Sequence, residues 1–341
     1  MKEHQEPAER KVQLTGGSTY TVSLPKEWAG EQEIEPGCYV NLYSRGDQLV
    51  MTRSNSGPDS QKHITHISAD GRDPSALALS VASAYVAGCD EIRIDGLGGH
   101  EQRRAITRTI RNFVGLEVMV EDERSLIART MLDVGDLSPE QTLAQLERTT
   151  LEMHEQAMKA VAGADGDVGR RVARQDDDVD RLFALVSRGF QQSLVDPAVT
   201  MGSGGLTSFE YYMAARQLER VADHAEKIAL IADRLDAEPP ADLQSTLLDF
   251  GERSREVVRR SLAGLLEEPI ASTSKLSGVI ADAEALLSEV SGVDAQLYDR
   301  EDLEDGYLLG LVIDSLTRST QYGVNIAEVG LQTRHRGGDS D

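Results

Sequence analysis

Helical periodicity over the last two thirds of the chain most constrains how these 341 residues can fold. From about residue 138 onward, apolar residues recur every three or four positions, and the alternation typical of strands is absent. The segment 138–141, SPEQ, is a capping box that starts the first helix. Further long amphipathic stretches follow at roughly 166–196, 206–236, 240–267, 270–300 and 302–333. Helices of this length joined by short loops form antiparallel bundles.

One half of this helical region repeats the other. Residues 218–229, LERVADHAEKIA, align with residues 316–327, LTRSTQYGVNIA. The identical pairs are Leu218/Leu316, Arg220/Arg318, Ile228/Ile326 and Ala229/Ala327. Both segments lie in the third helix of their half, so the pattern predicts two antiparallel three-helix bundles, over 138–237 and 238–333.

Two smaller units precede the bundles, so we expect a multidomain α+β protein. Residues 1–57 form the first, with alternating positions that predict four short strands and a helical turn near 25–29. The turn signals are Gly16-Gly17, Pro36-Gly37 and Gly46-Asp47, and the polar segment 54–61 predicts a linker. Residues 62–134 read as a small βαβαβ domain with strands at 63–67, 90–95 and 116–122.

Two acidic pairs in the first bundle could carry chemistry. Glu219 and Asp223 stand four residues apart on one helical face, and Asp176 and Asp180 have the same spacing on the preceding helix. If the two helices pack with these stretches level, four carboxylates converge and must hold protons or cations. Iron, manganese, magnesium and calcium all accept oxygen ligands. Acids are abundant in this chain, however, and spacing alone leaves a solvated helix face as the alternative.

The charge balance restricts the partners and the environment. The formal net charge is −23, and only 7 of the 35 basic residues are lysines. This is typical of a halophile protein kept soluble in strong salt, where the Debye length is about 3 Å at 1 M. An ordinary acidic protein that avoids nucleic acid is the alternative. The chain has no apolar run long enough for a membrane span and no signal-peptide pattern, so we expect a cytoplasmic protein.

The helical region resembles the PhoU family of phosphate uptake regulators, which are built from two three-helix bundles. The resemblance is carried by RQLERVADHAEKIA at 216–229, its weaker echo at 314–328, and DDDVD at 176–180. It implies a cluster of iron or another metal held by paired E/D-x-x-x-D motifs. The residues that fit as metal ligands in the first bundle are Asp176, Asp180, Glu219 and Asp223.

The second bundle departs from this pattern. Thr317 and Gln321 stand at the positions of the acidic pair in the third helix. On the helix before it, Leu286 falls four residues after Asp282, where a second carboxylate is wanted. A hydroxyl and an amide do not supply the negative charge that holds a cation cluster, so we expect metal in the first bundle and little or none in the second.

The N-terminal module resembles the AbrB/SpoVT/MazE family of swapped-hairpin β-barrels, in which two chains interleave and present basic side chains to DNA. The markers are VSLPKEW at 22–28 and IEPG at 34–37. The resemblance implies a homodimer, because two copies bury what one short module cannot. The phosphate-contact candidates are Arg10, Lys11, Lys26, Arg45 and Arg53. Residues 1–53 carry eight acids and six bases, so a dimerisation module without DNA affinity stays open.

Together the resemblances imply a DNA-binding regulator of phosphate uptake that represses transport or its genes when phosphate is plentiful. The alternative is an adaptor that docks on a phosphate transporter ATPase or a sensor kinase, with the β module serving only for dimerisation. No catalytic constellation is evident, so we do not expect an enzyme. A metal-dependent hydrolase is a distant third, because no histidine or lysine is placed as a general base beside the carboxylates.

Overall fold

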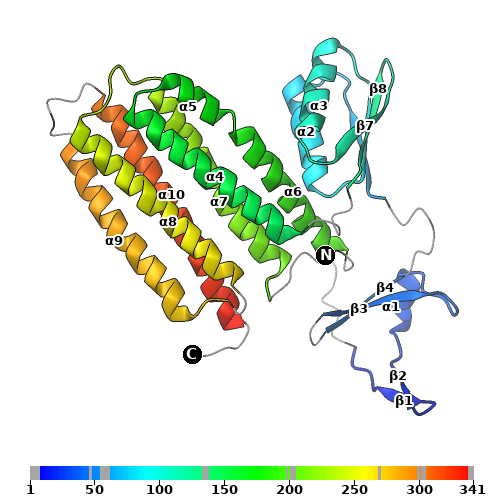
Figure 1. The fold of residues 1–341 in the computed structure, drawn as a ribbon. Helices are drawn as coiled ribbons and strands as arrows, with labels where there is room; N and C mark the ends of the chain where they lie inside the picture. The colour runs from blue at the N-terminus through cyan, green and yellow to red at the C-terminus, as the bar shows by residue number, and fades with distance from the viewer. Residues whose placement is uncertain are drawn as a thin grey trace. The chain divides into compact units, whose positions relative to one another are not determined.

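The chain folds as two compact units, Met1–Lys62 and His63–Asp341, in the computed structural model of Figure 1. The structure describes residues 8–45, 48–53, 62–132, 138–196, 199, 205–267, 270–297, 300 and 305–336. The predicted turn at 46–47 and the predicted linker at 54–61 lie outside these residues. Because each unit has its own internal contacts, each is described by itself.

The first unit consists of two hairpins and one short helix, as the sequence predicts. In chain order the elements are β1 (Gln13–Thr15), β2 (Thr19–Thr21), α1 (Lys26–Glu31), β3 (Val40–Arg45) and β4 (Gln48–Arg53). Strand β1 pairs with β2 and β3 with β4, both antiparallel, in two separate sheets. Gly16 and Gly17 both adopt positive φ, which confirms the predicted tight turn between β1 and β2.

This first unit has no buried core of its own among the residues that the structure describes. Its large apolar side chains are exposed instead: Tyr20 by 76%, Tyr39 by 77% and Leu49 by 62%. Two isolated hairpins with this much apolar surface in water are not expected to be stable alone. The exposed apolar surface is consistent with the resemblance to swapped-hairpin proteins, whose barrel closes only when two chains interleave.

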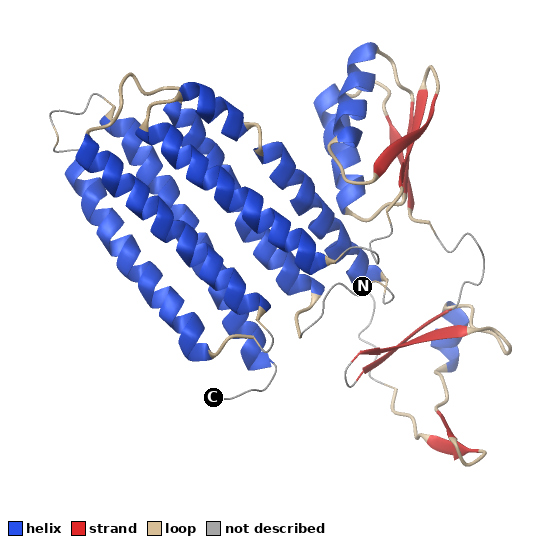
Figure 2. Ribbon diagram, viewed as in Figure 1, coloured by secondary structure: helices blue, strands red, loops and turns tan. Residues whose placement is uncertain are grey.

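The second unit begins with an α/β domain. Its elements are β5 (Ile64–Ser68), α2 (Pro74–Val86), β6 (Glu91–Asp95), α3 (His100–Arg111), β7 (Leu116–Glu121) and β8 (Ser125–Thr130). They form one mixed sheet in the order β5-β6-β8-β7, in which β5 and β6 are parallel and β8 is antiparallel to both neighbours. Helices α2 and α3 cover one face of the sheet (Figure 2). Their side chains Leu77, Val81 and Ile106 pack on Ile92 and Ile94 of β6.

The predicted βαβαβ pattern is incomplete, because strand β8 adds a fourth strand in the interior of the sheet. Its sequence SLIART follows a charged turn and ends in polar residues, so it lacks the continuous apolar run of an obvious interior strand. In the structure Leu126 and Ala128 face the helices and are fully buried, while Arg129 lies half-buried on the opposite face. Buried and exposed residues therefore alternate in β8, but over only a few positions.

In the part of the second unit after β8 that the structure describes, seven helices follow. They are α4 (Pro139–Ala162), α5 (Gly166–Ala173), α6 (Asp176–Val195), α7 (Ser208–Ala232), α8 (Ala241–Leu266), α9 (Thr273–Leu297) and α10 (Gly306–Arg336). Ser138 caps α4 by accepting a hydrogen bond from the Gln141 amide, as its sequence predicts. Every helix in the described ranges is too polar or too short to cross a membrane.

The stretch predicted as one helix over 166–196 is broken into α5 and α6 at Arg174 and Gln175. Three consecutive aspartates, 176–178, occupy the first turn of α6. Like charges repel one another inside a helix, whereas acids at a helix start are stabilised by the positive end of the helix dipole. The acidic run therefore favours a new helix start at this position.

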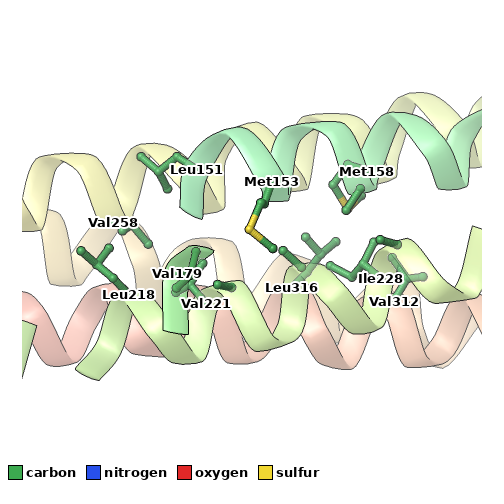
Figure 3. Packing of buried hydrophobic residues seen from close by; sticks show 14 of the residues in the cluster. Leu151, Met153, Met158, Val179, Leu218, Val221, Ile228, Val258, Val312 and Leu316 are labelled. Atoms are coloured by element: carbon green, nitrogen blue, oxygen red, sulfur yellow. The ribbon is translucent and has the colours of Figure 1, made fainter. Parts of the chain in front are cut away.

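The two bundles share one hydrophobic core. The repeated helices α7 and α10 pack against each other, and α4 packs against α8. Figure 3 shows Leu218 of α7, Leu316 of α10, Met158 of α4 and Val258 of α8 within this core, and all four are almost fully buried. The repeat predicted from the sequence thus places its matching leucines in a common interior.

Candidate metal centre

Helices α6 and α7 bring the two predicted acidic pairs together. They run antiparallel, because Phe190 near the end of α6 lies against Phe209 at the start of α7, while Asp176 in the first turn of α6 lies near Asp223 and Glu226 in the second half of α7. Val179 of α6 and Val221 of α7 belong to the same core cluster and are seen together in Figure 3. Packing at these valines fixes the register between the helices. It places Asp176 and Asp180 near the carboxylates of α7.

The four predicted carboxylates lie at the rim of the bundle core. Asp176, Glu219 and Asp223 are half-buried, whereas Asp180 lies closer to solvent. Partial burial, together with the charges of Asp180, the nearby Glu226, Asp223 and Glu219, raises the pKa of Asp176 to about 7. A carboxyl group with a pKa near neutrality is one whose ionised form lacks a counter-charge.

The pKa values of two neighbouring acids are raised for the same reasons. Removal from water raises the pKa of Asp180, with Asp223 and Asp177 contributing. Removal from water also raises the pKa of Glu219, and Asp223 adds to the shift. Within the described part of the chain, none of the four predicted ligands forms an ion pair with an arginine or lysine. The cluster is therefore held together by helix packing against its own electrostatic repulsion.

The donor atoms suit a hard or borderline cation. Glu219 Oε2 is buried and has no hydrogen-bond partner among the described residues, so one carboxylate oxygen is already removed from water. As the side chains stand, however, no three His, Cys, Asp or Glu residues in the described ranges meet closely enough to hold an ion. The carboxylates form an open cluster whose charge and oxygen donors fit a cation, and binding would need side-chain rearrangement.

Glu226 is a member of this cluster that the sequence analysis missed. It lies on α7 seven residues after Glu219 and three after Asp223, and a helix places such positions on one face. Its own pKa is raised by removal from water and then by Asp223 and Asp180. The acidic spacing of four and then three residues is the signal that could have identified it.

His224 is not part of the cluster. Its ring lies 5.8 Å from the ring of Tyr322 on α10, centroid to centroid, so it faces the second bundle. Burial lowers the pKa of His224 to about 4, with the charge of Lys227 contributing.

The corresponding positions of the second bundle form no acidic cluster. Thr317 donates a hydrogen bond to the carbonyl of Ile313, 2.9 Å away. Asp282 pairs with Arg260 at 2.7 Å, and Leu286 lies in the hydrophobic core with 1% exposure. The charge that a cation would need is therefore absent or already neutralised in these residues.

The predicted DNA contacts all lie in the N-terminal module, in several structural settings. Arg10 and Lys11 are exposed before β1, and Lys26 is exposed at the start of α1. Arg53 pairs with Glu33 at 2.6 Å, so part of its charge is neutralised inside the module. Arg45 ends β3 opposite Gln48.

The fold and the acidic cluster define a helical-bundle protein that also carries a separate β-hairpin module. Residues 143–232 match the family model of the PhoU domain, and residues 13–59 match that of MazE, a bacterial antitoxin that recognises its toxin. These matches confirm the resemblance to PhoU over the first bundle and the resemblance to the AbrB/SpoVT/MazE type over the N-terminal hairpins.

A solved structure and the curated proteins complete the comparison. The crystal structure of the phosphate transport system regulatory protein PhoU from Streptococcus pneumoniae is 21% identical in sequence, with a TM-score of 0.46. The match covers 60% of this chain and 96% of that chain. No curated protein matches the chain.

Proposed function

We propose that this protein regulates phosphate uptake as a DNA-binding transcription regulator that acts negatively when phosphate is plentiful. The observation that carries the proposal is the presence in one chain of a PhoU domain and a MazE-type domain. The first is a domain type of phosphate regulation, and the second is of a type that pairs with a second copy and presents basic residues to DNA. We place the protein in the cytoplasm, where it reaches DNA.

A metal bound at the first bundle is the proposed effector state. Asp176, Asp180, Glu219 and Asp223 would hold it, and the cation would supply positive charge that neutralises the carboxylates. These residues come from two helices, so their neutralisation removes the repulsion that pushes α6 and α7 apart. Support comes from the raised pKa of Asp176 and from the buried, unpartnered oxygen of Glu219.

Homodimerisation through the N-terminal module is part of the same proposal. The exposed apolar side chains of β1 to β4 would be removed from water by packing against another apolar surface, and a second copy of the module supplies such a surface. In such a dimer Arg10, Lys11 and Lys26 are doubled on one assembly. The net charge of −23 opposes DNA at low salt, so we propose that the protein is from a halophile and works where screening is strong.

Chromatin immunoprecipitation tests the proposed function directly. Under phosphate excess we expect the protein to be enriched at the promoters of phosphate transport genes, and under starvation we expect that enrichment to fall. A version without residues 1–62 is the control and should show no enrichment. Absence of enrichment in both conditions would contradict the DNA-binding role.

An adaptor role is the second candidate, and the Arg53–Glu33 ion pair favours it, because it leaves the module with fewer free basic groups. The helical bundles would then dock on a phosphate transporter ATPase or a sensor kinase. Co-purification of such a partner, together with no affinity for any DNA fragment at the working salt concentration, would select this alternative.

We do not propose an enzyme activity. The PhoU domain is a regulatory type, and the ring of His224 faces Tyr322 of the second bundle. Phosphate-ester turnover that disappeared in Asp223→Asn would overturn this assignment.

A further inference from the structure

Helix α6 connects the acidic cluster to the α/β domain. Its first turn carries Asp176 and its second Asp180, while Ala184, Arg188 and Gln192 follow at intervals of four residues toward its other end. Ala184 belongs to the hydrophobic core of the α/β domain, although it lies in a bundle helix. One helix therefore contributes to both sites.

Arg188 makes the central contact with the α/β domain. It is the largest side chain that is almost fully buried, with 1% exposure. Its Nη1 donates to the carbonyls of Tyr85 and Cys89, each 2.8 Å away, at the end of α2. Its guanidinium also lies 5.1 Å from the centre of the Tyr85 ring. A cation at the end of a helix satisfies carbonyls that have no partner within that helix.

Asp90 extends this contact to the beginning of the second unit. Its Oδ1 lies 3.4 Å from Arg188 Nη2, and its Oδ2 accepts a hydrogen bond of 2.8 Å from the His63 amide. The Asp90 amide in turn donates to the His63 carbonyl. His63 immediately precedes strand β5 and is the point at which the chain enters the unit.

The loop at Gly88 is fitted closely to the same face of α6. Gly88 has a positive φ of 89°, and a Cβ at this position would lie 2.7 Å from Gln192 Cγ. Gln192 donates a hydrogen bond of 3.3 Å to the Gly88 carbonyl. The loop therefore contacts α6 through two of its side chains, Arg188 and Gln192.

A buried arginine costs free energy, and its Nε has no partner among the described residues. Hydrophobic contact alone would hold the two parts together at lower cost. The guanidinium adds geometric specificity to the contact. Its planar donors reach two carbonyls and a carboxylate only in one position of α6. A small movement of the helix changes all three contacts.

We propose that α6 transmits the charge state of the acidic cluster to the α/β domain, with Arg188 as the positioning residue and Asp90 as its link to His63. The inference rests on the proposed function only in taking a cation as the natural trigger. Helix α6 is suited to this because it is separated from α5 and has no side-chain cap at Gln175. From Asp176 to Arg188 the helix spans roughly 18 Å.

Hydrogen exchange measured by mass spectrometry tests the proposal on the full chain. Two triggers are compared: Mn²⁺ alone added to the wild type, and the double variant Asp176→Asn with Asp180→Asn. Each is expected to change the exchange rate of segment 85–91 by roughly fivefold. The Arg188→Met variant keeps the apolar stem and should lose that response, whereas Gln191→Met, an exposed position on the same helix, should keep it.

The outcomes separate the inference from the proposed metal centre. If Mn²⁺ does not bind but the double variant changes exchange at 85–91, the inference stands and the metal assignment fails. If Mn²⁺ binds and neither trigger changes exchange there, or if Arg188→Met responds like the wild type, the inference is overturned.

A second variant covers the case in which Arg188→Met does not fold. Asp90→Asn leaves α6 intact and removes the carboxylate that joins Arg188 to the His63 amide, so segment 85–91 should still respond while segment 63–68 loses its response. An unchanged response at 63–68 would overturn the role given to Asp90.

Discussion

At the scale of single residues, two glutamates of this chain show how surroundings decide a role. Glu91 is 2% exposed, yet Arg129 and Arg93 cover it at 2.6 and 2.7 Å, and their hydrogen bonds lower its pKa. Glu219 has no such partner: removal from water raises its pKa, and Asp223 and Asp180 add to the shift. The first is a satisfied structural ion pair, whereas the second lacks the positive charge that a cation would bring.

Substitution of two predicted metal ligands tests whether the acidic cluster around Glu219 holds a cation. We expect elemental analysis of protein purified without chelator to show a transition metal, and the Asp176→Ala with Glu219→Ala variant to lose it, because half of the cluster charge is gone. The control is Asp282→Ala with Glu284→Ala, which removes the same charge from exposed positions of α9 and should leave the metal content unchanged. Full metal content in the first variant would show that the site is wrong.

The buried side chain of His154 should make the free energy of unfolding depend on pH. It has 0% exposure, its Nδ1 lies 3.3 Å from Arg255 Nη1, and its Nε2 has no partner among the described residues. Burial lowers the pKa of His154 to about 3, and the charges of Arg255 and His224 contribute. The unfolded chain therefore binds a proton near pH 6.5 that the folded chain does not. Stability due to this group is complete above about pH 6.5 and falls as the pH drops toward about 3.

The measurement compares urea unfolding of the wild type and of His154→Leu at several pH values and constant salt. The free-energy difference between them should rise by about 1.4 kcal/mol per pH unit between about pH 5 and about pH 6, and level off above about pH 7. A difference that does not vary with pH would contradict the assignment of a buried neutral histidine.

At the scale of secondary-structure elements, the sequence predicts what depends on local pattern. The long helices and the two hairpins follow from periodicity and spacing, and they are present. The spacing places each acidic pair on one helical face, but it could not show whether the two pairs lie level with each other. Strand β8 was missed because its pattern is short and polar at both ends. The break before α6 was missed because it depends on charge repulsion in an acidic run rather than on a glycine or proline.

The contact of α6 with the α/β domain could not be predicted from the sequence. Arg188 binds backbone carbonyls about one hundred residues earlier in the chain. Any residue has a backbone carbonyl, so no residue pattern marks the partner. Only the packing of the elements reveals such a contact.

Two glycines test the close packing of α5 on α7. A Cβ at Gly169 would collide with the Ala229 carbonyl oxygen, whereas Gly278 of α9 has no neighbouring atom within 4 Å of its Cβ position. We expect Gly169→Ala to destabilise the fold by roughly 2 kcal/mol, because a rigid backbone atom must move. Gly278→Ala should stabilise it by roughly 0.5 kcal/mol through helix propensity. Thermal or urea unfolding measures both, and equal effects would contradict the packing.

At the scale of the whole molecule, the chain combines parts of opposite character. The bundles and the α/β domain have buried cores and share helix α6, whereas the N-terminal module exposes its apolar residues. The bundles carry much of the acidic surface, and the predicted DNA contacts all lie in the module. Under the proposed function, binding to DNA would be a balance between local attraction at the module and long-range repulsion from the remainder of the protein.

Charge reversal separates these two contributions. Lys11→Glu with Lys26→Glu should weaken binding to every DNA sequence alike, because phosphate contacts carry no sequence information, and the slope of log affinity against log salt should fall by roughly 2 per protomer. Lys159→Glu with Lys275→Glu is the matched control, since it makes the same change in net charge at exposed positions of the bundles. Fluorescence anisotropy over a range of salt concentrations measures both. If the control weakens binding as much as the module variant, the effect comes from the total charge, and the module does not contact DNA through these lysines.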